Sequence, residues 1–241
     1  NPMFAHAEAL APNTYAPDAD QALGQIAVKL PGATAVFRRW KLDFCCGGQL
    51  SLRKAAAAKG LDAQAVLAEL LALQHGSIEP VASDPAALIG HILTRYHAVH
   101  RDQLPELIRM ADRVEAVHRD HPQVPAGLAD LLKTMEQELL VHMEKEETIL
   151  FPMLLDGGNP FVSDPIEMMR AEHVDHGALL DQLAALTHDT TAPEGACTTW
   201  RALYSGVNQL TDDLMNHIHL ENNLLFAQFD DPATGQPDRP L

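Results

Sequence analysis

Aromatic residues are scarce in this sequence of 241 residues, at 5%, although 46% of its residues are hydrophobic. β-Sheets favour aromatic and β-branched side chains, whereas alanine and leucine are abundant here. The composition therefore argues against a β-sandwich. It predicts an all-α protein with enough hydrophobic residues for a sizeable core.

Cysteine, basic residues and long apolar runs are also scarce. Three cysteines, two of them adjacent, do not form a disulfide framework, and the first residues show no secretory signal pattern, so we expect a cytoplasmic protein. No stretch approaches the ~20 apolar residues of a membrane span. The 33 acidic residues outnumber 17 basic ones, and a net charge of −16 repels phosphate backbones. We therefore expect neither a membrane nor a nucleic acid as a partner.

Proline and glycine positions predict the domain organisation. Short helical patterns in the first third are interrupted near Pro31, Gly47 and Gly60, whereas the remainder has long helical patterns. The predicted segments are a disordered tail (1–18), a small helical domain containing the Cys-Cys pair (19–76), a four-helix bundle (84–230) and a second tail (231–241).

The long helices are predicted from Asp84 to His118, Pro125 to Leu155, Ser163 to His188 and Pro193 to Phe229. Pro105 should kink or break the first helix, and Pro125 fits the first turn of the second. Ser163 or Asp164 should cap the third. Short connections between four such helices indicate an up-down bundle.

A repeat links the second and fourth predicted helices. The stretches that begin at His142 and His217 both read His-x-x-x-Glu-x-x-x-Leu-Phe, with Glu146 and Glu221 as the acidic residues. A His and a Glu four residues apart lie on the same face of a helix. One such pair arises easily by chance, but two in equivalent positions predict a shared buried site.

The other two helices should each supply a facing ligand. Between His97 and His142 the separation is 45 residues, and between His173 and His217 it is 44, so equivalent hairpins favour this pairing. His100 and His176 give separations of 42 and 41, which match nearly as well. Spacing alone leaves both solutions open.

With His97 and His173, the site holds four imidazoles and two carboxylates. That set has too many ligands for one tetrahedral zinc and no thiolate, and it suits iron, with manganese as a substitute. If both carboxylates bridge two metals, each metal receives two histidines and two carboxylate oxygens. An oxo or hydroxo bridge would complete a di-iron centre with one open position on each metal.

The second half of the chain resembles the hemerythrin-like domains. From about Asp20 to Phe229 the chain resembles the repair-of-iron-centres family, cytoplasmic di-iron proteins induced by nitrosative and oxidative stress. The matching stretches are Asp43-Phe-Cys45-Cys46-Gly-Gly, Arg95-Tyr-His97 with the following His100-Arg-Asp-Gln-Leu-Pro-Glu106, His142-x-x-Lys-Glu146-Glu-x-Ile-Leu-Phe-Pro152, Glu172-His173, Ala196-Cys197-Thr-Thr-Trp200 and His217-x-x-Leu-Glu221-Asn-Asn.

The resemblance implies the metal ligands His97, His142, Glu146, His173, His217 and Glu221, and so selects His97 over His100 and His173 over His176. Glu138 and Glu172 match acidic positions near the family's iron pair. They could orient imidazoles, with solvated surface acids as the alternative. Cys45 and Cys46 could relay electrons, bind metal transiently or close a strained vicinal disulfide, with simple packing of small side chains as the alternative.

The resemblance also implies a function, the repair of damaged iron–sulfur clusters with help from the iron pair. The partners would be damaged iron–sulfur proteins, with NO or O₂ as small ligands, and a homodimer is compatible with the sequence. A carrier or sensor of O₂ or NO is the second hypothesis, but no output domain is visible. An NO-reducing di-iron enzyme is the third, and no electron donor is evident.

Overall fold

The computed structural model describes residues 15–73 and 83–230. Within these residues the protein is all helical, with one isolated β-bridge between Ala22 and Ser51 and no strand. The predicted fold class is therefore confirmed. Three predicted segments lie wholly or mostly outside the described residues. They are the second tail, most of the first tail and most of the linker between the two predicted domains. None of the helices within these two ranges is both long and apolar enough to cross a membrane.

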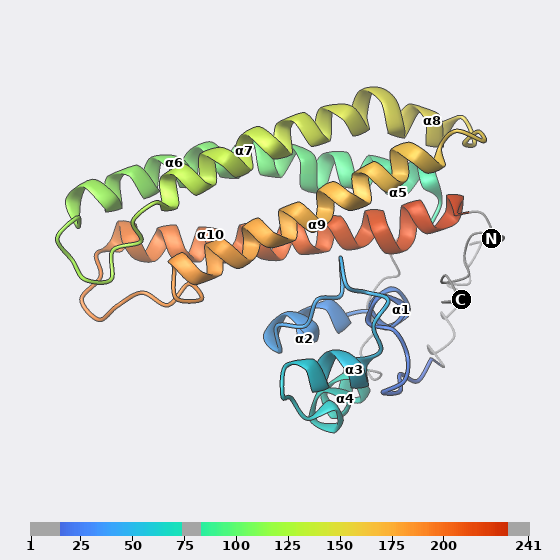
Figure 1. Cartoon of the computed structure of the whole chain (residues 1–241), viewed down its shortest axis with the longest axis horizontal. Helices are drawn as coiled ribbons and strands as arrows, with labels where there is room; N and C mark the ends of the chain where they lie inside the picture. The colour runs from blue at the N-terminus through green and yellow to red at the C-terminus, as the bar shows by residue number, and fades with distance from the viewer. Residues whose placement is uncertain (1–14, 74–82, 231–241) are drawn as a thin grey trace, which may run out of the picture.

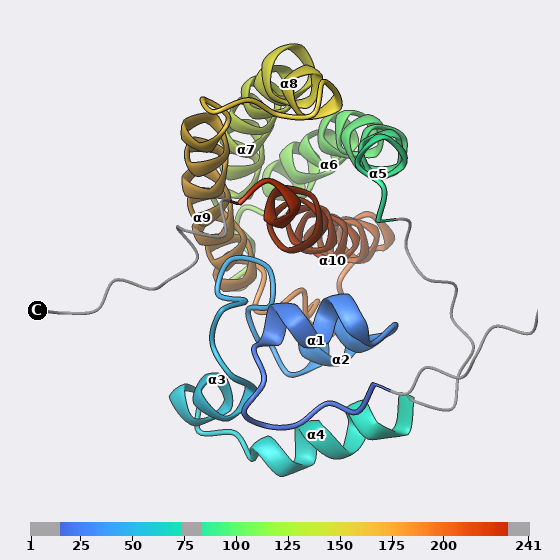
Figure 2. The same cartoon turned by 90° about the vertical axis from the view of Figure 1, so that its right-hand side faces the viewer.

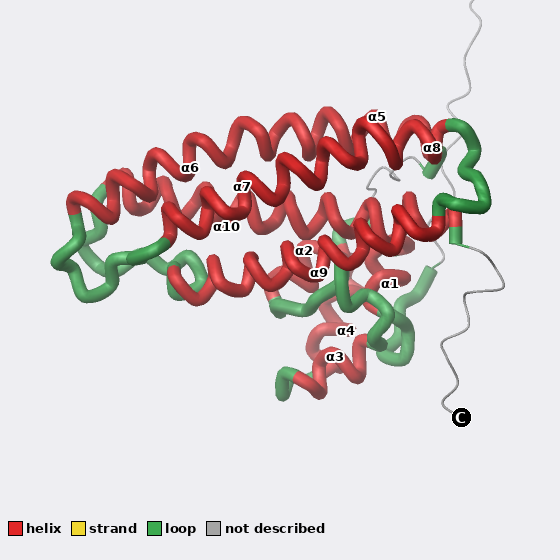
Figure 3. Tube along the Cα trace, turned by 45° about the horizontal axis from the view of Figure 1, so that its top comes forward, coloured by secondary structure: helices red, strands yellow, loops and turns green. Residues whose placement is uncertain are grey.

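Four long helical rods form the bundle (Figure 1). The first is α5 (Pro85–Ile92), η2 (Leu93–His97) and α6 (Ala98–Val117); the second is α7 (Leu128–Lys145), η3 (Glu146–Leu150) and α8 (Phe151–Leu155); the third is α9 (Ser163–Leu186); the fourth is α10 (Thr198–His219), η4 (Leu220–Leu225) and η5 (Phe226–Phe229). Each rod contacts its neighbours in chain order, and α10 also contacts α6. The rods run alternately up and down, as Figure 3 shows, so the predicted topology is confirmed.

A small group of short helices packs against one side of the bundle, below α9 and α10 in Figure 2. These helices are α1 (Leu23–Lys29), α2 (Ala33–Arg39), α3 (Leu52–Ala58) and α4 (Ala63–Ala72). Gly32 and Gly60 separate them in left-handed backbone conformations (φ 88° and 66°) that favour glycine. One hydrophobic cluster includes Leu23 of α1 and Leu214 of α10, so the two parts share a core. The division of the chain into two domains stays a prediction.

The bundle's apolar core has two clusters, and the predicted ligands lie between them. Along α9, Met169 belongs to one cluster and Leu180 to the other, with His173 between them. Along the first rod, Tyr96 belongs to the same cluster as Met169 and Leu104 to the same cluster as Leu180, with His97 between them. Apolar packing at both ends therefore keeps bulk water from the middle of the bundle.

The predicted break at Pro105 and the predicted place of Pro125 in the first turn of the second helix are wrong. The helix α6 continues through Pro105 without a break. Leu104 and Leu107 are buried there, and burial of each contributes about 1.5–3 kcal/mol, which offsets the hydrogen bond that proline removes. Pro125 precedes α7, which begins only after Gly127, where Glu115 of α6 accepts hydrogen bonds from the backbone N–H groups of Gly127 (2.6 Å) and Ala129 (2.9 Å).

The start of α9 also differs from its prediction. Ser163 is the first residue of the helix, and Val162 occupies the capping position without a side-chain hydrogen bond. Asp164 therefore lies in the first turn, where a carboxylate interacts favourably with the helix dipole, and Pro165 follows within that turn.

Three short π-helical segments interrupt the rods. They are η2, η3 and η4, and His97, Glu146 and Glu221 lie in them, one in each. A π segment inserts an extra residue into a helix and re-aims the side chains that follow, and such segments are frequent at functional sites. No pattern in the sequence predicts these segments.

Candidate metal centre

The structure brings all six predicted ligands together in the middle of the bundle. Every one of them is at most 1% exposed. Their ligand atoms form two groups in which all atoms lie within 4.8 Å of one another. The groups are His97, Glu146, His217 and Glu221, and His142, Glu146, His173 and Glu221. Each group thus has two histidines of its own and shares the two carboxylates. We call them the 97/217 subsite and the 142/173 subsite.

Most of the atoms that face the centre lack hydrogen-bond partners. Both carboxylate oxygens of Glu146 and of Glu221, and the Nε2 atoms of His97 and His217, are buried without one among the described residues. The His142 and His173 Nε2 atoms lie 3.1 Å apart and face each other. Buried polar atoms without partners are costly, at about 1–3 kcal/mol each, unless they bind a metal. The donor set therefore fits a pair of metal ions.

Burial and mutual repulsion govern the charges at this site. Burial, helped by the neighbouring His142, lowers the pKa of His173 to about 4. Burial and His100 hold the pKa of His217 well below its usual value. Both rings are therefore neutral, as metal ligands must be. Burial and the charge of Glu146 raise the pKa of Glu221 well above the usual range, which a cation between these carboxylates would reverse.

His142 is the exception among the four imidazoles. Burial alone would lower its pKa, but Glu146 and then Glu172 raise it. Its Nδ1 atom lies 3.3 Å from Glu172 Oε1, and Lys145 contacts the same carboxylate at 2.6 and 2.7 Å. The predicted role of Glu172, to orient an imidazole, would use this contact and stays a prediction. Glu138, in contrast, is exposed on α7, and no hydrogen bond or ion pair joins it to the six ligands among the described residues.

Each remaining histidine also has a partner on the ring nitrogen that faces away from the centre. Glu147 Oε2 lies 2.9 Å from His97 Nδ1, and Asn222 Oδ1 lies 2.7 Å from His173 Nδ1. Because these oxygens only accept, each Nδ1–H donates and each Nε2 is left for a metal. The sequence analysis missed Glu147 and Asn222, although each directly follows a ligand glutamate in the repeated motif.

The fourth imidazole is oriented by a chain of bonds. His100 Nε2 lies 3.0 Å from His217 Nδ1, and His100 Nδ1 lies 3.3 Å from Gln103 Oε1. Burial lowers the pKa of His100 to about 4, so it is neutral, donates to Gln103 and accepts from His217. His100 thus supports a ligand. His176 is buried as well, with its ring centroid 4.8 Å from that of His142.

The Cys45-Cys46 pair lies beside the bundle rather than in it. Both thiols are free, with the sulfur atoms 3.9 Å apart; Cys45 is buried and Cys46 half-buried. Cys46 Sγ donates to the backbone oxygen of His173 at 3.3 Å, so the pair adjoins the metal centre. Together with Asp43, the two thiols form a further group of close potential metal ligands.

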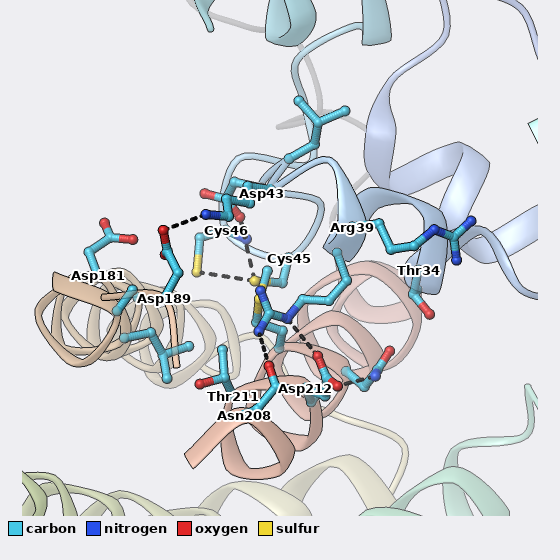
Figure 4. A pocket seen from close by; sticks show the side chains of 18 of the residues that line it. Thr34, Arg39, Asp43, Cys45, Cys46, Asp181, Asp189, Asn208, Thr211 and Asp212 are labelled. Atoms are coloured by element: carbon cyan, nitrogen blue, oxygen red, sulfur yellow. Dashed lines mark hydrogen bonds and ion pairs between the residues drawn. The ribbon is translucent and has the colours of Figure 1, made fainter. Parts of the chain in front are cut away.

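The same two cysteines line a cavity of about 980 Å³ between the small helical part and α9 and α10. Figure 4 shows the two sulfur atoms with Asp181, Asp189 and Asp212 on the facing helices and loop. Two of the basic side chains there form ion pairs, Arg38 with Asp212 at 2.6 Å and Lys41 with Asp189 at 2.7 Å. The cavity gives small molecules a route to Cys46.

Comparisons with known proteins agree with this geometry. Residues 88–229 match the family described as Hemerythrin HHE cation binding domain, and residues 19–74 match ScdA_N, a domain of unknown function (DUF542). Relatives named "Iron-sulfur cluster repair protein YtfE" include one from Cronobacter sakazakii, 50% identical, and one from Escherichia coli O157:H7, 49% identical. Each match spans 211 residues, 87% of this chain and 96% of the relative. The chain therefore belongs to the YtfE family of iron–sulfur cluster repair proteins, whose second part is a hemerythrin HHE domain.

Proposed function

We propose that this protein repairs iron–sulfur clusters damaged by nitrosative or oxidative stress, and that it does so with iron held by His97, His142, Glu146, His173, His217 and Glu221. The function is that of the named relatives. The observation that carries it to this chain is the pair of buried subsites that share Glu146 and Glu221. Imidazole and carboxylate ligands without a thiolate suit iron.

Two iron ions are the proposed cofactor, and Glu146 and Glu221 would each contribute to holding both of them. When bound, they would supply redox-active iron. The chain's own contribution is to fix the ligands. The Nδ1–H groups of His97 and His173 donate to Glu147 and Asn222, which leaves both Nε2 atoms aimed at the centre. The apolar clusters above and below exclude water.

The clients would be proteins with damaged iron–sulfur clusters, and NO or O₂ would be the small molecules that reach the centre. Cys46 lies at the cavity wall and contacts the backbone of His173, so a thiol role in the release or reduction of iron is part of the proposal. A homodimer and a cytoplasmic location stay predictions.

A repair assay tests this function. A [4Fe–4S] enzyme inactivated by peroxide is incubated with the iron-loaded protein and a reductant, and its recovered activity is measured. Wild type should restore it faster than the same concentration of free ferrous iron. Glu221→Ala should lose this advantage, because both subsites lose a shared ligand. Glu167→Ala, which removes an exposed carboxylate of α9, is the matched control and should repair normally. Equal repair by Glu221→Ala and wild type would contradict the proposal.

A further inference from the structure

The residue that follows each bridging glutamate occupies the same place in both halves of the bundle. Glu147 follows Glu146 in η3 and contacts the facing His97, whereas Asn222 follows Glu221 in η4 and contacts the facing His173. The position is equivalent, but one side chain is a carboxylate and the other an amide. The two halves of the metal centre are therefore supported differently.

The outer contacts of these two residues explain the difference. The Glu147 carboxylate is held by Arg101 of α6 at 2.9 and 2.7 Å, so its support comes from within the bundle. Asn222 Nδ2 instead donates to the backbone oxygen of Cys45 at 3.0 Å. An amide accepts from the histidine and donates to the carbonyl at once, whereas a carboxylate only accepts. Asn222 thus connects His173 to residues 43–48, which we call the thiol segment.

A second set of bonds holds the same segment, residues 43–48, against the bundle. Cys46 Sγ donates to the backbone oxygen of His173 at 3.3 Å. Asn223, next in η4, donates to the backbone oxygen of Phe44 at 3.0 Å and contacts His219 Nδ1 at 2.7 Å. The segment therefore contacts the backbone of His173 directly, through Cys46, and the ring of His173 through Asn222.

We propose that Asn222 is a positioning residue that couples the 142/173 subsite to the Cys45-Cys46 segment. A metal at that subsite fixes the ring of His173, and through Asn222 it fixes the segment and limits access to Cys46. A change in the segment acts back on His173, because such coupling is reciprocal. The 97/217 subsite has no bond to the segment among the described residues. The inference rests on the proposed two-metal site.

The reactivity of Cys46 is the readout. Its alkylation by iodoacetamide is followed by mass spectrometry, with and without bound ferrous iron. In wild type, iron should slow the reaction about fivefold or more, at the lower end of typical coupling factors. Asn222→Asp keeps the acceptor for His173 but loses the donor to Cys45, so iron should no longer slow the reaction.

The matched control is Glu147→Gln, the equivalent change in the other half of the centre, which should keep the slowing by iron. Asn222→Ala serves as a second variant and should lose it, as Asn222→Asp does. Iron content is measured in the same samples. A variant that binds iron and still shows the wild-type slowing would overturn the coupling while leaving the metal site intact. A wild-type protein that binds iron without any slowing would overturn it as well. Failure of wild type to bind iron would instead overturn the proposed function.

Discussion

At the residue scale, the four imidazoles share one arrangement: the Nε2 atom approaches one of the two shared glutamates and the Nδ1 atom has a polar partner. The Nε2 atoms of His97 and His142 lie 3.5 and 3.1 Å from Oε1 of Glu146, and those of His173 and His217 approach Glu221. The partners of the Nδ1 atoms differ in charge, and replacing such a partner typically reduces metal affinity about 10- to 100-fold. Differences between the two subsites therefore originate in residues that do not touch the metal.

The two adjacent thiols should differ sharply in reactivity. The hydrogen bond to Cys46 and burial raise the pKa of the Cys45 thiol well above its ordinary value, so Cys45 stays protonated at pH 8 and unreactive. Limited alkylation at pH 8, read by tandem mass spectrometry, should modify Cys46 and leave Cys45 unmodified. Denatured protein, in which both react, is the control. Preferential labelling of Cys45 in the folded protein would contradict this description.

Some of the six candidate ligands could be predicted from sequence spacing alone, and others could not. His142 and His217, each with a glutamate four residues later, follow from helix periodicity alone. His97 and His173 had close rivals in His100 and His176, because spacing along a helix cannot tell a ligand from a residue one turn away. The rivals are buried beside the site as well. Only the resemblance to a known family separated them.

At the element scale, the π segments η3 and η4 contain the two shared glutamates and the residues that follow them. In η4, one turn provides Glu221 to the metal centre and Asn222 and Asn223 to the thiol segment. No hydrophobic period signals such a segment, since it changes a helix by one residue. This is why the sequence predicted the helices but not the contact between η4 and Cys45.

Close packing of the thiol segment gives an element-scale prediction. A Cβ at Gly48 would lie 2.6 Å from the backbone oxygen of Phe44, so Gly48→Ala must displace the segment. We expect a loss of about 1–3 kcal/mol in the free energy of unfolding, measured with urea, and faster alkylation of Cys46. Gly90→Ala in α5 is the control: nothing lies within 4 Å of its Cβ, and it should gain about 0.5–1 kcal/mol. A Gly48→Ala protein as stable as wild type would contradict the close packing.

At the scale of the whole molecule, the small helical part and the bundle share a core and meet at the metal centre. Local sequence patterns predicted the helical rods and their up-down order. They could not show how the parts meet, because contacts such as Cys46 to His173 join residues 127 positions apart. Long-range contacts of this kind depend on packing rather than on any local pattern.

The six candidate ligands lie in the middle of the bundle, between its two apolar clusters. Burying six polar ligands between two apolar clusters is costly in the protein alone and becomes favourable once metal satisfies them. The two subsites share Glu146 and Glu221, so their occupancies should depend on the same two carboxylates.

Iron content is the most direct test of the two-subsite centre. Protein reconstituted with ferrous iron under anaerobic conditions and desalted is analysed for iron per chain. Wild type should hold about two irons, as di-iron bundles do. His97→Ala should retain the 142/173 subsite and about one iron, and Glu221→Ala, which damages both subsites, should hold far less. A wild-type protein with a single metal per chain, or a Glu221→Ala variant that keeps both, would contradict the account.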